Sequence, residues 1–150
     1  MNGKRLYIIA GCNGAGKTTA SFNMLPAILH CREFVNADEI ARGISPFQPE
    51  KVAFEAGRIM LERISELMDQ GVDFAFETTL STRSFKKFIE RAKNRGYYIS
   101  LLFFWLESPE LAIKRVQTGG RRRPRHSKIN HHPSLSSRIE EFIQLVLRYL

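Results

Sequence analysis

Residues 11–18 have the sequence GCNGAGKT, which fits the pattern G-x-x-x-x-G-K-[ST]. Glycines in such a loop let backbone N–H groups close around phosphate oxygens, and the start of a following helix adds partial positive charge. Lys17 would reach the β- and γ-phosphates of a nucleotide, and the Thr18 hydroxyl would hold Mg²⁺. The sequence therefore predicts a nucleotide site made of Gly11, Asn13, Gly14, Ala15, Gly16, Lys17, Thr18 and Thr19.

Two acidic residues follow predicted strands and are candidates for the remaining chemistry. Asp38 lies in VNADEIA, just after a short strand, and Glu77 lies in FETTLST, at the end of the next strand. The carboxyl ends of parallel strands line a ligand crevice, so Asp38 could accept a hydroxyl proton or hold the metal. The same residues equally fit a helix cap at Asp38, with Glu39 competing for the chemical role. Glu77 fits either a metal or substrate contact or a capped turn.

Arg115 is a basic candidate further along the chain, on a predicted helix after SPELAIK. A guanidinium there could swing over the phosphates as an arginine finger supplied in cis. An exposed helical arginine explains the same residue without any chemistry. Cys12, inside the loop, is interpreted as a variable position rather than a nucleophile.

Strands and helices alternate along the chain, which predicts an α/β fold with a parallel sheet. Strands are expected at 6–10, 33–36, 73–79 and 97–106. Helices are expected from Gly16 to Pro26, from Pro49 to Gly71, before Gly96, and from Ser108 to Val116. The run YYISLLFFWL is apolar throughout, as expected of a strand covered on both faces.

Length and composition limit the class of protein. A chain of 150 residues with 43% hydrophobic residues has the size and core of one domain. Its net charge is +8, and residues 118–150 hold 7 Lys/Arg against 2 Asp/Glu, so the basic character belongs mostly to the tail. The two cysteines, Cys12 and Cys31, form neither a disulfide framework nor a zinc spacing, which makes the cytoplasm the default compartment. No apolar run has the length of a membrane span.

Taken together, these segments resemble the zeta-toxin family of P-loop kinases. The resemblance rests on GCNGAGKTT, NADEIA, FETTLS and GYYISLLFFWLESPELAIKRV with their spacings, and it covers roughly residues 4–117. It implies a P-loop NTPase fold, with an adenylate-kinase-like parallel sheet flanked by helices. It also implies transfer of the γ-phosphate of ATP or GTP, with Mg²⁺, to a sugar-nucleotide hydroxyl such as that of UDP-N-acetylglucosamine, and an antitoxin protein as partner.

The resemblance also implies a role for each candidate residue. Lys17 and Thr18 would contact the nucleotide and Mg²⁺, and Asp38 would be the base that takes the acceptor's proton. It places Glu77 and Thr79 at the metal and substrate, and Arg115 at the phosphates. Lys17, Asp38 and Arg115 are thus the expected catalytic residues, and Thr18 and Glu77 the expected metal contacts.

The resemblance weakens after Val116, where the family continues with a lid of approximately G-G-H-x-[IV]-P-x-x-x-I-x-R-R-Y. Here Gly119 and Gly120 are followed by RRRPRHSKINHHPS. If the third base of each codon in this segment is chosen to fit, the neighbouring reading frame can encode G-G-H-G-I-P-K-S-T-I-I-R-R-Y. A lid whose coding sequence is frameshifted is therefore our leading interpretation. A diverged lid and a basic nucleic-acid arm are the alternatives. The arm is disfavoured because no aromatic residue is interleaved between 118 and 141.

We therefore divide the chain into a P-loop kinase-like core at 1–117 and a lid and tail at 118–150 of the same domain. We expect residues 118–136 to be irregular. Without a lid that holds an arginine over the phosphates, we expect nucleotide binding with slow or absent phosphate transfer. The alternative functions are a non-catalytic nucleotide-binding relic and a nucleic-acid-associated ATPase that uses the basic tail.

Overall fold

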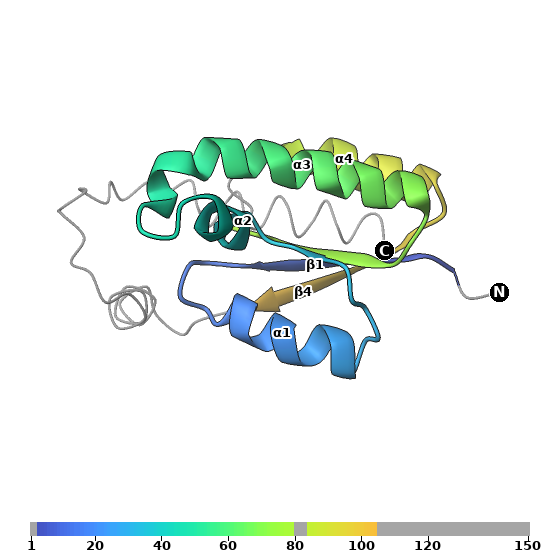
Figure 1. The fold of residues 1–150 in the computed structure, drawn as a ribbon. Helices are drawn as coiled ribbons and strands as arrows, with labels where there is room; N and C mark the ends of the chain where they lie inside the picture. The colour runs from blue at the N-terminus through green and yellow to red at the C-terminus, as the bar shows by residue number, and fades with distance from the viewer. Residues whose placement is uncertain (1–2, 80–83, 105–150) are drawn as a thin grey trace, which may run out of the picture.

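The computed structural model describes residues 3–79 and 84–104. In these residues four parallel strands form one sheet in the order β2-β3-β1-β4 (Figure 1). The strands are β1 (Arg5–Gly11), β2 (Phe34–Val35), β3 (Phe74–Thr78) and β4 (Tyr98–Phe104). The helices are α1 (Lys17–Ala27), α2 (Ala37–Ile44), α3 (Ala53–Gln70) and α4 (Ser84–Asn94), with a 3-10 helix η1 (Pro49–Val52) before α3.

Strand β1 lies in the middle of the sheet, with α1 on one face and α3 and α4 on the other (Figure 1). Successive side chains of a strand point to opposite faces. Leu6 and Ile8 therefore join the cluster under α3 and α4, whereas Tyr7 and Ile9 join the cluster under α1. This two-sided burial explains why the strand is apolar throughout rather than alternating.

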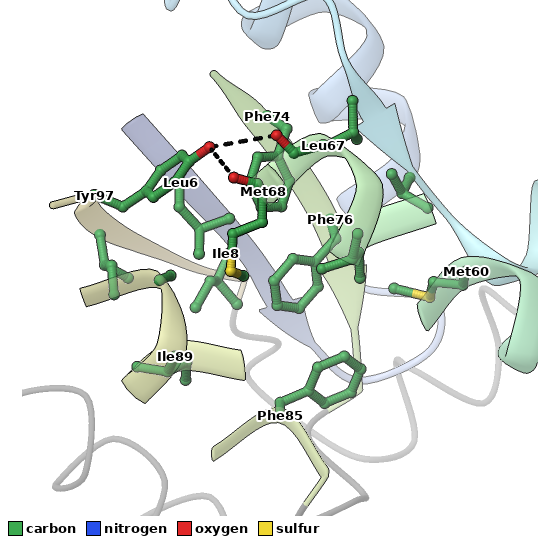
Figure 2. Close-up of a cluster of buried hydrophobic side chains, with 14 of the residues drawn as sticks. Leu6, Ile8, Met60, Leu67, Met68, Phe74, Phe76, Phe85, Ile89 and Tyr97 are labelled. Carbon is green, nitrogen blue, oxygen red and sulfur yellow. Dashed lines mark hydrogen bonds between the residues drawn. The ribbon is translucent and has the colours of Figure 1, made fainter. Parts of the chain in front are cut away.

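The larger cluster, between the sheet and α3 and α4, is shown in Figure 2. Phe76 of β3 stacks on Phe85 of α4 with ring centroids 5.0 Å apart. The Tyr97 hydroxyl donates to the Val72 main-chain oxygen at 3.0 Å and also lies 3.4 and 3.5 Å from those of Leu67 and Met68, at the end of α3 (Figure 2). The smaller cluster contains Cys31, and burial raises the pKa of its thiol to about 11.

The helical spacing predicted after Pro49 is confirmed, with one change at its start. Pro49 begins the 3-10 helix η1, and α3 follows it. Helix α3 buries the face that the spacing indicated, through Ala56, Met60, Ile64 and Leu67. It ends at Gly71, whose φ of 70° and N–H bonds to Leu67 and Met68 form a glycine cap.

Two predictions need correction. A helix, α2, follows β2, and its cap is Asn36 rather than Asp38. The burial expected along residues 97–106 holds for Ile99 but not for Tyr98, which is 72% exposed. The helix predicted from Ser108, the lid and the tail all lie outside the described residues. None of the helices described at 3–79 and 84–104 is both long and apolar enough to cross a membrane.

Gly11 offers a test of the packing between β1 and β4. It pairs with Phe104 and has a φ of 145°, and a Cβ added there would lie 2.4 Å from the Phe104 main-chain oxygen. We expect Gly11→Ala to lower the free energy of unfolding by about 3 kcal/mol, measured by chemical denaturation. Gly57, inside α3 with open space around its Cβ position, is the control, and Gly57→Ala should raise stability by about 1 kcal/mol. Equal effects of the two substitutions would contradict this account.

Candidate functional site

The predicted phosphate-binding residues form a glycine-rich turn between β1 and α1. Gly14 and Gly16 have φ values of 81° and 84°, a conformation that glycine adopts without steric cost. No side chain caps α1 at Gly16, and Ala20 donates to the Gly16 carbonyl. The first N–H groups of α1, including those of Lys17 and Thr18, therefore have no intrahelical partner. Such N–H groups at a helix start form a site for an anion.

Lys17 lies under this turn, with its side chain only 4% exposed. Its ammonium Nζ donates to the Cys12 carbonyl oxygen at 2.9 Å and lies 3.6 Å from Glu77 Oε1. The Glu77 side chain is 10% exposed, so each charge needs the other to compensate for lost hydration. A lysine ammonium is a compact charge on a flexible stem. It can therefore exchange the Cys12 carbonyl for a phosphate oxygen without a change of backbone.

Glu77 reaches α1 because of its place in β3. Its register partner is Ile9 of β1, and the side-chain alternation of β3 turns Glu77 toward the α1 face of the sheet. There the Thr18 hydroxyl donates to Glu77 Oε2 at 2.8 Å. The structure thus joins the two residues that the sequence analysis assigned to the metal.

The side-chain oxygen atoms of Thr18 and Glu77 are chemically suited to bind Mg²⁺. A hydroxyl and a carboxylate oxygen are hard ligands of the kind that Mg²⁺ prefers. Within residues 3–79 and 84–104, no group of three or more His, Cys, Asp or Glu side chains is arranged to hold a metal ion. A Mg²⁺ ion here would therefore take most of its ligands from phosphate and water, as is usual for this ion.

Asn36 is a member of the site that the sequence analysis missed. Its side chain is buried, and its Nδ2 donates to Glu77 Oε2 at 2.8 Å and to Thr18 Oγ1 at 3.4 Å. Its Oδ1 accepts from the N–H of Asp38 at 2.8 Å and from the N–H of Glu39 at 3.4 Å. A capping signal was present in the sequence, because Asn36 is followed three residues later by Glu39.

Asp38 lies in the first turn of α2, and its side chain is exposed. Among the described residues its carboxylate accepts no hydrogen bond and forms no ion pair, whereas its main-chain N–H donates to Asn36 Oδ1. This leaves both carboxylate oxygens available to an acceptor molecule. Thr79 follows the end of β3, two residues after Glu77, and is exposed. Arg115 lies outside the described residues, so its predicted role at the phosphates stays a prediction.

A comparison with protein families agrees with this geometry. The model of a family described as Zeta toxin matches residues 2–147. The chain belongs to the zeta toxin family. The match extends beyond Val116, the residue after which the motif resemblance weakens. The frameshifted lid stays a prediction.

Relatives of this zeta toxin family member include an uncharacterized protein of Haemophilus influenzae, 29% identical over 118 residues, which are 78% of this chain and 81% of that protein. A solved structure from the PezAT chromosomal toxin–antitoxin system of Streptococcus pneumoniae has a TM-score of 0.63 at 23% identity. It covers 78% of this chain, which spans about half (52%) of that chain. A candidate kinase of Chloroflexus aurantiacus has a TM-score of 0.62 at 14% identity, covering 79% and 68% of the two chains.

The fold predicted from the sequence is confirmed. Four parallel strands flanked by helices, with a glycine-rich turn after β1, form the α/β sheet that the sequence predicted, and the similar solved structures share this fold. At identities below 25% the two solved structures support this shared fold alone. A fold alone does not determine activity or substrate, which depend on the residues of the site.

Proposed function

We propose that this protein is a phosphotransferase that moves the γ-phosphate of ATP or GTP to a hydroxyl group of a small molecule. The observation that carries the proposal is the buried contact of Lys17 and Thr18 with Glu77 at the end of the phosphate-binding loop. Lys17 supplies positive charge for the β- and γ-phosphates, and the loop N–H groups hold their oxygens. Membership of the zeta toxin family supports the same chemistry.

Thr18 and Glu77 are the residues that we propose as the Mg²⁺ site. Thr18 Oγ1 and Glu77 would hold the ion, directly or through its water ligands, next to the phosphates. When bound there, Mg²⁺ would neutralise negative charge on the phosphate group that is transferred. Asn36 and Lys17 keep the Glu77 carboxylate oriented toward that position.

The acceptor side of the proposal rests on Asp38. Its carboxylate stands exposed at the start of α2, at the same edge of the sheet as the loop. A carboxylate without hydrogen-bond partners of its own can accept the proton of an attacking hydroxyl. By the family resemblance we take a sugar nucleotide, UDP-N-acetylglucosamine, as the acceptor to try first. Thr79 and Glu77 would contribute contacts to it.

The cellular setting follows from the same chemistry. ATP, GTP and sugar nucleotides are cytoplasmic metabolites, so we place the protein in the cytoplasm. The similar Streptococcus pneumoniae structure comes from a toxin–antitoxin system, which supports an antitoxin protein as the partner to seek here. Nucleic acid is not the expected partner, because no aromatic residue is interleaved with the basic residues between 118 and 141.

The proposal is tested by incubating the 150-residue protein with γ-labelled ATP or GTP, Mg²⁺ and UDP-N-acetylglucosamine. We expect Mg²⁺-dependent nucleotide binding and transfer of label to the sugar nucleotide. Because the arginines of residues 118–150 do not match the family lid, we expect the rate to lie below the ordinary kinase range of about 1–100 s⁻¹. Binding without any transfer would support a nucleotide-binding relic instead, and hydrolysis stimulated by RNA or DNA would support a nucleic-acid-associated ATPase. Absence of nucleotide binding would contradict all three.

A further inference from the structure

The Asn36 side chain links two parts of the site that the chain brings from different elements. Asn36 follows β2 and caps α2, and its side chain also contacts Glu77 of β3 and Thr18 of α1. The orientation of its amide follows from its neighbours. Two main-chain N–H groups require an oxygen at one end, so the amino end must face the Glu77 carboxylate.

Capping alone does not explain an amide at position 36. Serine, threonine and aspartate cap helices as well as asparagine does, and aspartate would also suit the positive end of α2. An aspartate here would place a second carboxylate against Glu77. The one buried ammonium nearby among the described residues, that of Lys17, lies 3.6 Å from Glu77 Oε1 and balances a single negative charge. A hydroxyl can also accept and donate, but serine and threonine are too short to reach both partners, so among these capping residues asparagine alone serves α2 and Glu77 at once.

We propose that Asn36 is a positioning residue that fixes the start of α2, and with it Asp38, relative to Glu77 and Thr18. The inference rests on the proposed phosphotransferase function. Asp38 would serve the acceptor, whereas Thr18 and Glu77 would serve the metal and phosphates. Transfer needs the reacting atoms about 3–3.5 Å apart, so a small movement of α2 would separate acceptor from phosphate and leave the nucleotide site intact.

The first test uses Asn36→Ser, which keeps a capping hydroxyl but is too short to hold Glu77. We expect kcat to fall about 10- to 100-fold, and the Mg²⁺ concentration for half-maximal nucleotide binding to rise about tenfold. The KM for nucleotide at saturating Mg²⁺ and the affinity for metal-free nucleotide should stay close to those of the parent. Asn23→Ser is the matched control, because Asn23 is exposed on α1 and its side chain donates, within the described part of the chain, only to the Thr19 carbonyl. It should change none of these quantities.

The second test compares the melting temperatures of Asn36→Asp and Asn36→Ser and needs no turnover. The charged groups around position 36 are Glu77 on β3, Lys17 on α1, and Asp38 and Glu39 on α2. An aspartate at position 36 would face the Glu77 carboxylate, and the Lys17 ammonium balances only one of the two negative charges. We therefore expect Asn36→Asp to melt below Asn36→Ser at pH 8.

The outcomes separate this inference from the proposed function. If Asn36 only caps α2, Asn36→Asp melts at or above Asn36→Ser at pH 8, and Asn36→Ser keeps the parent's kcat and Mg²⁺ dependence. Either result overturns the inference and leaves the proposed function standing. A parent that binds Mg²⁺-nucleotide without transferring phosphate would overturn the function alone, because the Mg²⁺ dependence and the melting comparison still decide whether Asn36 holds Glu77.

Discussion

Lys17→Ala is expected to weaken Mg²⁺-nucleotide binding by about 10- to 100-fold in an equilibrium titration. The loss corresponds to one hydrogen bond between charged groups, which contributes about 1.5–3 kcal/mol. The Lys17 ammonium is already buried beside the loop, where its Nζ donates to the Cys12 carbonyl at 2.9 Å. It therefore needs little reorganisation to meet a phosphate. Identical affinities for the parent and Lys17→Ala would show that the nucleotide binds elsewhere.

The same substitution also changes stability, which must be separated from binding. Without Lys17, the Glu77 carboxylate keeps the Thr18 and Asn36 donors but loses its compensating charge. Removing one partner of a buried pair costs about 3 kcal/mol at the lower end of the usual range. That end applies here because Nζ and Oε1 are 3.6 Å apart. In Lys17→Ala/Glu77→Gln the free energy of unfolding should recover, whereas nucleotide affinity should not.

The place of the glycine-rich turn that carries the proposed phosphate site could be predicted from the sequence because its determinants are local. The glycines, Lys17 and Thr18 are consecutive in the chain, and the strand before them is an unbroken apolar run. The structure places them between β1 and α1 as that pattern requires. The helical face of α3 was equally predictable, since a repeat such as Met60, Ile64 and Leu67 has the period of a helix whatever it packs against.

The link between Glu77 and Asn36 could not be predicted in this way. Their contact depends on the order of β2 and β3 in the sheet and on the register that pairs Val35 with Phe76. Neither the strand order nor the register can be deduced from a local sequence pattern. The capping signal of Asn36 was local, but the nearby carboxylate of Asp38 competed for the same interpretation. The exposure of Tyr98 was missed because its apolar neighbours predicted burial on both faces.

Asp38→Asn is expected to reduce the rate of phosphate transfer at least about 10²-fold relative to the parent. Asparagine has the same shape as aspartate but cannot take a proton from the acceptor hydroxyl. The fold should tolerate the change, because Asn36 caps α2 through the main-chain N–H of Asp38 and not through its side chain. A first-turn carboxylate contributes about 0.3–1 kcal/mol through the helix dipole, so the melting temperature should fall only slightly.

Glu39→Gln is the matched control for Asp38→Asn. Glu39 also lies in the first turn of α2, so its loss removes the same charge from the same end of the helix. Its carboxylate is already paired with Arg42 on the surface, which leaves it less free to serve an acceptor than Asp38. We therefore expect similar small losses of stability in the two variants, with the transfer rate reduced only in Asp38→Asn. A reduced rate in Glu39→Gln with full activity in Asp38→Asn would move the base to Glu39. The proposed nucleotide site at Lys17 and Thr18 would be unaffected by that reassignment, because these residues lie on α1 and contact β3 rather than α2.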